Sequence, residues 1–230
     1  MNIGFIGLGN VGGKLAGSLL RNGFELTVHD LNRELVAEFV EQGARSVDGP
    51  RALMQACDAV ITCLPSPAAS AAVVDEMLPA VDDSKTWLEM STTDAGEVKR
   101  LASLVEARGG SAIECPVSGG CHRADTANIS IFAGCDRATF ERMLPTLTTL
   151  GRRVLHTGEI GTASVLKVMT NYLATANLLS CCEALVTMKA AGMDLNTTYE
   201  AMKISSGTSF VHETESQLIL NGSRDVSFTM

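Results

Sequence analysis

The first twelve residues, Met1-Asn-Ile-Gly-Phe-Ile-Gly7-Leu-Gly9-Asn-Val-Gly12, decide the fold class. An apolar strand runs directly into a Gly-x-Gly-x-x-Gly loop, and the loop opens an amphipathic helix that ends at Gly23. In such a unit the first glycine permits a tight turn, the second lets a pyrophosphate approach the backbone, and the third lets helix and strand pack closely. Free amides at the helix N-terminus also favour phosphate. The stretch therefore predicts a dinucleotide-binding unit of the Rossmann type.

Further apolar runs follow this first strand before residue 160. They are Leu26–His29, Ala59–Cys63, Thr86–Met90, Ala112–Cys115 and Ile129–Phe132. Amphipathic stretches separate most of them, as in Arg33–Gln42 and Glu97–Arg108, and each of these two is followed by a glycine that fits a helix end. Continuous apolar strands that alternate with helices are typical of a parallel sheet covered on both faces. We therefore predict an α/β fold, with a doubly wound parallel sheet in a domain spanning residues 1–160.

The pattern changes after Gly158–Gly161, where the strand signals end. Residues 161–191 read as one helix of roughly 29 residues that is apolar on nearly all sides, which predicts that it is buried. Shorter helical stretches follow at 197–202 and 213–220. The sequence thus predicts an all-helical C-terminal domain spanning residues 161–230. Because few residues remain to cover so apolar a helix, we expect an incomplete domain or a partner chain, as in a homodimer or homotetramer.

Composition excludes several classes of protein. The 230 residues carry 18 Lys and Arg against 26 Asp and Glu, a formal net charge of −8, whereas nucleic-acid and membrane-surface binders have a basic surplus. Lys167, Asn171, Glu183 and Lys189 interrupt the most apolar segment, so we expect no membrane span. The seven cysteines form no CxxC pair and the first residues form no basic leader, which predicts reduced thiols, no signal peptide and a cytoplasmic protein.

Asp30 stands at the end of the second predicted strand, 18 residues after Gly12. A carboxylate at this position accepts hydrogen bonds from the adenosine ribose hydroxyls of a dinucleotide and repels a 2′-phosphate, which favours NAD over NADP. Arg33 lies close enough in the sequence to keep NADP open. Two alternatives also stay open at this point: Asp30 caps the next helix, or the glycine loop and the acidic strand end belong to a methyltransferase.

A second group of motifs lies further along the chain. Cys115-Pro-Val-Ser-Gly-Gly120 follows the fifth strand, Gly158-Glu-Ile-Gly161 leads into Lys167-Val-Met-Thr-Asn171 on the long helix, and Ser205-Ser-Gly-Thr-Ser209 lies in the helical region. In this order and spacing, and together with the N-terminal glycine loop, the motifs resemble the β-hydroxyacid dehydrogenase family, a branch of the 6-phosphogluconate dehydrogenase superfamily whose best-known member is 3-hydroxyisobutyrate dehydrogenase. The resemblance runs from residue 1 to about residue 230.

Lys167 and Asn171 are four residues apart and share one face of the predicted helix. Lys167 stands among Val165, Leu166 and Val168, which predicts a desolvated amine with a lowered pKa, suited to exchange a proton with an alcohol. Taken alone, a lysine in such a helix usually extends its amine to solvent. The resemblance implies instead that Lys167 is the catalytic acid/base and that Asn171 assists it.

Ser118, Gly119 and Gly120 combine a hydroxyl with backbone amides in a tight loop, which suits a carboxylate, although the same letters also describe an ordinary turn. The resemblance implies that this loop binds the acid group of the substrate, with Ser206 and Gly207 on the substrate side. It also implies that the cofactor lies along the strand ends. The cofactor-binding residues are then Gly7, Leu8, Gly9, Asn10, Val11, Gly12, Asp30, Leu64, Pro65, Ser91 and Thr92.

The sequence departs from the family pattern in three places. His122 and Arg123 follow the glycines where the family has small residues; beside an anion-binding loop they fit a second acidic group on the substrate, or they face solvent. Residues 92–95 lack the proline that commonly follows the family's Ser-Thr. The sequence also ends before a Lys-Asp helix of the family, so we expect a chain truncated relative to its relatives.

The sequence therefore predicts an NAD(P)-dependent oxidoreductase that transfers hydride between a nicotinamide and a small β-hydroxyacid, or a semialdehyde in the reverse direction. The expected partner is a small anionic hydroxyacid, with no metal, nucleic acid or membrane. Two other interpretations stay open. One is a dinucleotide-binding scaffold or sensor that does no chemistry, which Lys167 and Asn171 oppose and the missing C-terminal segment favours. The other is an imine reductase, a relative that usually lacks the lysine.

Overall fold

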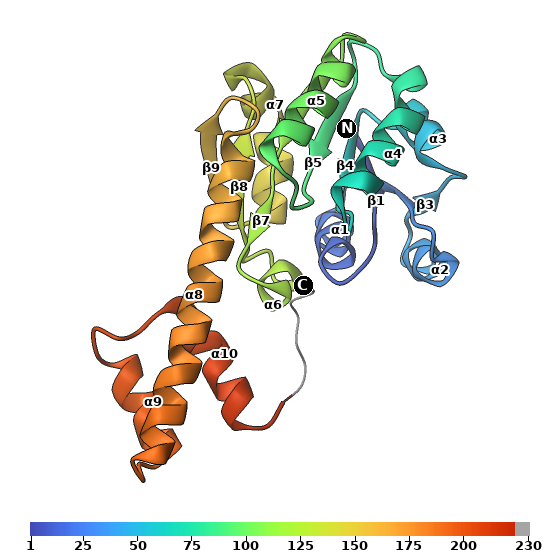
Figure 1. Cartoon of the computed structure of the whole chain (residues 1–230). Helices are drawn as coiled ribbons and strands as arrows, with labels where there is room; N and C mark the ends of the chain where they lie inside the picture. Colours follow the sequence, from blue (N-terminus) through green and yellow to red (C-terminus); the bar gives the residue numbers. More distant parts are fainter. Residues whose placement is uncertain (224–230) are drawn as a thin grey trace. The chain divides into compact units, whose positions relative to one another are not determined.

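The computed structural model describes residues 1–223 of the chain, apart from the side chains of Cys121 and His122. The chain divides into two compact units, one from Met1 to Val168 and one that begins at Met169 (Figure 1). The division falls inside a long helix, α8 (Thr162–Ala190). The domain boundary between residues 160 and 161 stays a prediction.

A mixed β-sheet forms the centre of the first unit. Its strands are β1 (Asn2–Ile6), β2 (Glu25–His29), β3 (Arg45–Ser46), β4 (Ala59–Thr62), β5 (Thr86–Glu89), β6 (Ser111–Glu114), β7 (Val117–Ser118), β8 (Ser130–Gly134) and β9 (Arg153–Gly158). They lie in the order β3-β2-β1-β4-β5-β6-β8-β7, and β9 pairs with β8. The strands from β1 to β6 pair in parallel, whereas β8 runs antiparallel to β6 and β7. The six predicted strands are confirmed.

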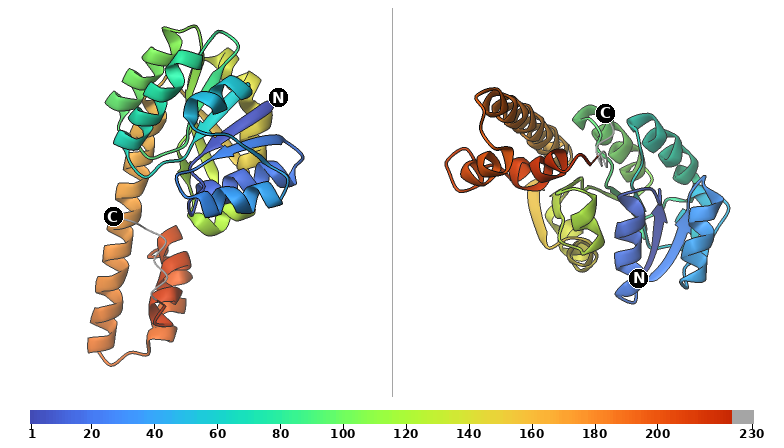
Figure 2. Two further views of the ribbon diagram at one scale, coloured as in Figure 1. Left: turned by 90° about the vertical axis from the view of Figure 1, so that its right-hand side faces the viewer. Right: turned by 90° about the horizontal axis from the view of Figure 1, so that it is seen from below.

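Helices cover both faces of this sheet (Figure 2). They are α1 (Gly12–Arg21), α2 (Arg33–Glu41), α3 (Pro50–Ala56), α4 (Pro67–Met77), the 3-10 helix η1 (Leu78–Ala80), α5 (Ala95–Glu106), α6 (Cys121–Asp125) and α7 (Arg137–Leu150). Ile61 and Leu88 pack with α1, α2 and α7, while their neighbours Val60 and Trp87 pack with α3, α4 and α5. Successive strand residues point to opposite faces, so the unbroken apolar runs fill two cores. The predicted doubly wound fold is confirmed.

Polar caps begin the helices that follow the central strands. Ser66 accepts a hydrogen bond from the amide of Ala69 in α4, and Asp94 accepts one from the amide of Glu97 in α5. Such caps satisfy amides that have no partner inside the helix. Asp94 thus caps α5 two residues after the predicted Ser91-Thr92 segment, in the stretch that lacks a proline.

The described part of the second unit consists of helices joined by turns, with no strand. It contains the rest of α8, then α9 (Leu195–Lys203) and α10 (Phe210–Leu220). The ring of His212 lies 4.8 Å from the ring of Tyr199 and is 3.1 Å from the Tyr199 carbonyl and 3.0 Å from the Ser216 hydroxyl. These buried contacts hold α9 against α10. The all-helical prediction is confirmed for these residues.

The prediction that the long helix is buried is wrong for the single chain. Tyr172, Leu179 and Val186 are 65%, 61% and 69% exposed, while Cys181 and Leu185 are buried. A helix that is apolar on all sides is expected to be buried, but this pattern does not indicate whether the residues that bury it come from the same chain or from a partner chain. The predicted homodimer or homotetramer stays a prediction.

The cysteines within the described residues form no disulfide. Burial raises the pKa of the Cys57 thiol and raises that of Cys135 to about 12, so both are packing groups and not reactive thiolates. No helix among residues 1–223 is both long enough and apolar enough to cross a bilayer. The cytoplasmic location stays a prediction.

Candidate active site

The glycine loop has the geometry that its sequence predicts. Gly7 has a φ of 96° and donates its amide hydrogen to the His29 carbonyl at 3.2 Å. A Cβ atom on Gly7 would collide with the Cys63 carbonyl, and one on Gly12 would collide with the Gly7 carbonyl. At Gly9 a Cβ would meet nothing within 4 Å, and this residue is exposed. The backbone is therefore tightly packed at Gly7 and Gly12 and open at Gly9, which leaves a cradle that fits a pyrophosphate.

Asp30 holds this loop from the neighbouring strand end. Its Oδ2 accepts a hydrogen bond of 2.6 Å from the amide of Leu8, and its Oδ1 accepts one of 2.8 Å from the amide of Asn32. Asn32 is the residue that caps α2, through a 3.0 Å bond from the amide of Glu34. The alternative in which Asp30 caps the helix is therefore wrong. Asn10 is exposed and Val11, directly before α1, is half-buried.

Hydrogen bonds join the ends of β4 and β5 beside the glycine loop. The amide of Leu64 donates to the Ser91 hydroxyl at 2.7 Å, and the amide of Ser91 donates to Oε1 of Glu89 at 2.8 Å. Pro65 and Thr92 are exposed next to these bonds. The carboxyl ends of parallel strands are where such sheets bind ligands, so this network lies where a cofactor cleft is expected.

Glu114 forms a second network at the end of β6. Its Oε1 accepts hydrogen bonds from the amides of Gly161 at 2.6 Å and Ala163 at 2.7 Å. Its Oε2 accepts bonds from the amide and the hydroxyl of Ser164, at 3.1 Å and 2.5 Å. The side chain is 1% exposed. The carboxylate therefore anchors the first turn of α8 to the sheet.

The loop after β6 turns sharply through its glycines. Gly119 and Gly120 have φ values of 132° and 81°, which side-chain-bearing residues rarely adopt. Ser118 is half-buried and Gly120 is exposed at the start of α6. Arg123 is exposed, and its Cδ would lie 3.3 Å from a Cβ on Gly119, so its stem lies beside the loop. The side chain of His122 is outside the described residues.

Lys167 lies on the buried face of α8. It is 9% exposed, and burial lowers its pKa to about 8. The direction of the shift and its cause, desolvation, agree with the sequence prediction, but the flanking residues that the prediction named are not buried. Val165, Leu166 and Val168 are 55%, 37% and 45% exposed, because residues adjacent to the lysine in the sequence point to other sides of the helix. Lys167 is therefore desolvated on its own, buried face of the helix.

The remaining predicted residues belong to the second unit. Asn171 is half-buried one turn after Lys167, and Ser206 and Gly207 are exposed between α9 and α10. In the first unit, hydrogen bonds join the glycine loop to Asp30, and Leu64 to Ser91. The catalytic and binding roles of all these residues stay predictions.

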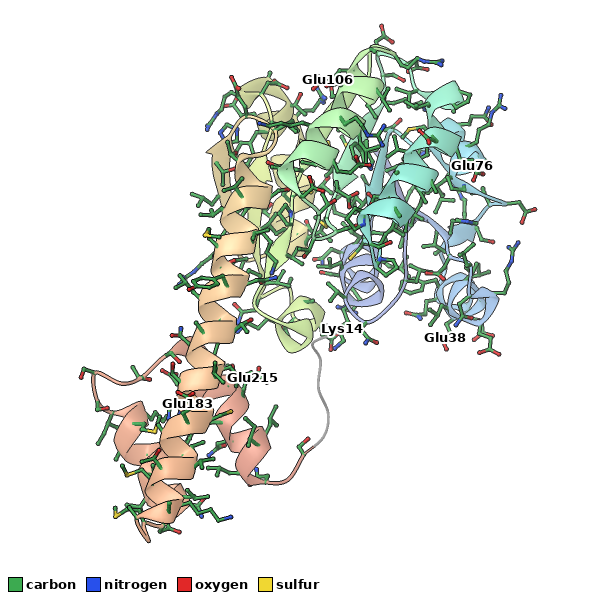
Figure 3. All side chains as sticks on the ribbon, viewed as in Figure 1. Lys14, Glu38, Glu76, Glu106, Glu183 and Glu215 are labelled. Carbon is green, nitrogen blue, oxygen red and sulfur yellow. The ribbon has the colours of Figure 1, made fainter. Side chains whose placement is uncertain are left out.

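Sequence reasoning missed Glu89 and Glu114, which pair in register on neighbouring strands. Each is the last residue of a strand and 1% exposed, in contrast to Glu38, Glu76 and Glu106, which point outward from their helices (Figure 3). Burial raises the pKa of Glu89, which favours its neutral form. A carboxylate inside an apolar strand run is the signal that identifies both, because a buried acid needs partners.

A glycine loop after β1 and a carboxylate after β2, at the carboxyl ends of parallel strands, define a dinucleotide-binding protein of the Rossmann class. Among residues 1–223, and leaving aside the side chains of Cys121 and His122, no group of three or more His, Cys, Asp or Glu side chains is arranged to hold a metal ion. The open backbone at Gly9 and the carboxylate of Asp30 fit a dinucleotide.

Comparison with known proteins identifies the family. Residues 2–158 match the NAD binding domain of 6-phosphogluconate dehydrogenase, and residues 161–230 match the family described as NAD-binding of NADP-dependent 3-hydroxyisobutyrate dehydrogenase. The chain is 32% identical to a 3-hydroxyisobutyrate dehydrogenase of Pseudomonas aeruginosa, over 90% of this chain and 70% of that protein. It is 30% identical to a 2-(hydroxymethyl)glutarate dehydrogenase of Eubacterium barkeri, over 100% of this chain and 78% of that protein.

A solved structure gives the same result. A 3-hydroxyisobutyrate dehydrogenase from Salmonella typhimurium has a TM-score of 0.87 and 25% identity, covering 96% of this chain and 79% of its own. The chain belongs to the β-hydroxyacid dehydrogenase family of NAD(P)-dependent oxidoreductases. The family predicted from the motifs is confirmed, as is a nicotinamide dinucleotide as its class of cofactor, and the methyltransferase alternative is excluded.

Proposed function

We propose that this chain is an NAD-dependent dehydrogenase that oxidises a small β-hydroxyacid, or reduces the corresponding semialdehyde in the reverse direction. The observation that carries the proposal is the burial of Lys167: the residue is 9% exposed, and burial lowers its pKa to about 8. Perturbed pKa values of this kind concentrate at functional sites. Family membership supports the same reaction class.

The cofactor would be held by the Gly7–Gly12 loop and by Asp30. The backbone at Gly9 borders open space and suits the pyrophosphate, while Asp30 suits the adenosine ribose hydroxyls. The nicotinamide, when bound, accepts or supplies the hydride. We favour NAD because the Asp30 carboxylate repels a 2′-phosphate. In addition, the Arg33 guanidinium, which could otherwise bind that phosphate, lies 3.3 Å from the Asp48 carboxylate.

Lys167 would move the proton. A group whose pKa lies near the working pH is available in both protonation states. In the oxidation, the neutral amine of Lys167 takes the proton of the substrate hydroxyl while hydride leaves the carbon that bears this hydroxyl. In the reduction, its ammonium returns that proton to the oxygen. Asn171, one turn along the helix, would orient the hydroxyl.

The substrate would be an anion. The amides and hydroxyl of Ser118–Gly120 suit its carboxylate, since the left-handed glycine backbone allows successive amides to converge. Arg123 beside this loop favours substrates that carry a second acidic group. The Eubacterium barkeri relative is named for such a compound, a substituted glutarate.

The test is nicotinamide reduction, followed by absorbance, with NAD or NADP and a panel of small hydroxyacids that includes dianionic and sulfonated members. Lys167→Met should lower kcat on the best substrate by roughly 10²- to 10⁴-fold, the usual contribution of general acid–base catalysis. Lys189→Met is the matched control, because Lys189 is an exposed lysine on the same helix. Full turnover by Lys167→Met would overturn the proposal.

The scaffold alternative makes the opposite prediction. A protein that only binds the dinucleotide retains its affinity for NAD, measured by calorimetry, but reduces it with none of the acids. An imine reductase would oxidise an amine and none of the hydroxyacids. The same panel, extended by one cyclic amine, therefore separates the three functions.

A further inference from the structure

Glu114 lies between the two parts of the proposed site. It is the last residue of β6, and the loop that contains Ser118–Gly120 begins directly after it. Its side chain reaches the first turn of α8, the helix that carries Lys167. One residue thus connects the substrate loop, through the backbone, with the lysine helix, through its carboxylate.

The carboxylate is saturated by this helix. Three backbone amides, from Gly161, Ala163 and Ser164, and the Ser164 hydroxyl donate to its two oxygens at 2.5–3.1 Å. The first amides of a helix have no partner within the helix, and the helix dipole favours a negative charge there. The partner here is 47 to 50 residues away in the sequence, so the interaction fixes tertiary structure and not only the helix itself.

Two glycines leave room for this arrangement. Gly134 on β8 pairs with Glu114, and a Cβ on Gly134 would collide with Oε1 of the carboxylate. Gly161 has a φ of 100°, and a Cβ there would collide with the side chain of Lys99. A methyl group at Gly134 would displace the carboxylate and would also press on the Glu159 carbonyl.

Lys167 follows the anchored turn on the same face of the helix. Ala163 and Ser164, four and three residues before it, are 0% and 2% exposed, and Lys167 is 9% exposed. Residues at this spacing lie one above the other. A movement of the anchored turn therefore moves the amine of Lys167 relative to the sheet.

We propose that Glu114 is a positioning residue, which holds the first turn of α8 on the end of β6 and so keeps the amine of Lys167 in register with the Ser118–Gly120 loop. This proposal rests on the proposed function, in which Lys167 moves the proton. Glu114 acts through Lys167 and takes no part in the proton transfer itself.

The test is a double-mutant cycle on the full chain. Glu114→Gln keeps the size of the side chain but turns an amide NH₂ toward backbone amides, so it breaks part of the anchor. We expect kcat on the best hydroxyacid to fall about ten-fold or more, because small misplacements of a catalytic group have large effects. KM for NAD should stay within about two-fold. The exposed Glu106→Gln on α5 is the control.

The cycle separates positioning from general support of the fold. If Glu114 acts through Lys167, Glu114→Gln leaves the residual turnover of Lys167→Met unchanged. An equal loss in both backgrounds, or no loss in the wild type, would overturn the proposal. Gly134→Ala should reproduce the loss from the other side of the carboxylate. Should Glu114→Gln not fold, Ser164→Ala, which removes one donor and keeps the charge, takes its place in the cycle.

A readout without turnover completes the test. Acetylation of Lys167 by acetic anhydride, mapped by mass spectrometry, should be several-fold faster in Glu114→Gln than in the wild type, while Lys189 is unchanged. An unchanged Lys167 rate would count against the proposal even if no substrate were found. Full turnover by Lys167→Met, by contrast, would overturn the proposed function, and the labelling result would still show whether Glu114 holds the lysine.

Discussion

The carboxylate of Glu114 accepts a hydrogen bond of 2.5 Å from the hydroxyl of Ser164, 50 residues further along the chain. Both residues are buried. Hydrogen bonds to buried charged groups each contribute about 1.5–3 kcal/mol to stability, and more is lost when the charge keeps fewer partners. The bond therefore joins the strand that begins the substrate loop to the helix that carries Lys167, and it does so inside the first unit.

Substitutions at Gly9 and Gly12 of the N-terminal loop should have different effects on cofactor affinity and on stability. Gly9→Ala places a methyl group in open space at an ordinary backbone angle, so the free energy of unfolding should change by less than about 1 kcal/mol. Affinity for NAD should fall at least ten-fold, because that methyl occupies the phosphate cradle. Gly12→Ala, whose Cβ meets the Gly7 carbonyl, should instead lose about 2 kcal/mol or more. Thermal unfolding and calorimetry measure both; equal NAD affinity in Gly9→Ala contradicts the site.

Charge at Asp30 should decide between NAD and NADP. Asp30→Asn keeps the size and one acceptor oxygen beside Leu8, while the charge that repels a 2′-phosphate is lost. The ratio of Kd values for NADP and NAD should therefore fall roughly ten-fold or more. Glu25→Gln, an exposed acid at the start of the same strand, is the control. A ratio that stays at the wild-type value would place the ribose elsewhere.

Burial of Lys167 should lower the free energy of unfolding at pH values below the pKa that the amine has in the folded state. The pKa is lowered from 10.5 to about 8, so the unfolded chain binds more protons between these values and stability rises with pH across that window. Below pH 8 the buried ammonium costs up to about 3 kcal/mol. Lys167→Met should thus raise the free energy of unfolding at pH 7, and the gain should shrink as pH rises from 8 toward 10.5. Urea titrations at both ends check this; a gain independent of pH would mean that packing, and not charge, is responsible.

The exposed apolar residues of α8 predict self-association. Val165, Tyr172, Leu179 and Val186 recur every seven residues and are 55–69% exposed, which places them on one stripe of the helix. We expect light scattering at micromolar concentration to give at least twice the mass of one chain. Leu179→Glu should shift the protein toward the monomer. A monomeric wild type at these concentrations would contradict the predicted homodimer or homotetramer.

The sequence indicates most of the sheet because its central strands are buried on both faces and so appear as unbroken apolar runs. β3 and β7 are two residues long, and β9 (Arg153–Gly158) lies at the edge with its residues half-buried or exposed, so none of the three shows such a run. A strand of this kind is defined by its partner and not by its own pattern.

The candidate site divides in a similar way. Local spacing identifies the glycine loop and Asp30, because their partners are near in the sequence or follow from the fold. The role of Glu114 depends on Gly161–Ser164, and no local pattern shows a partner so far away. The lowered pKa of Lys167 and its cause, desolvation, are predicted, yet the adjacent apolar residues are themselves exposed, so they are not what buries the amine.

The central claim is that Lys167 moves the proton, and the pH dependence of kcat tests it most directly. A general base works as the free amine, so oxidation of the hydroxyacid should accelerate as pH rises through about 8, and reduction of the semialdehyde should slow over the same range. In Lys167→Met the limb of the pH profile near pH 8 should be absent from the turnover that remains, while Lys189→Met should retain it. A limb near pH 8 that persists in Lys167→Met would assign the proton transfer to another group.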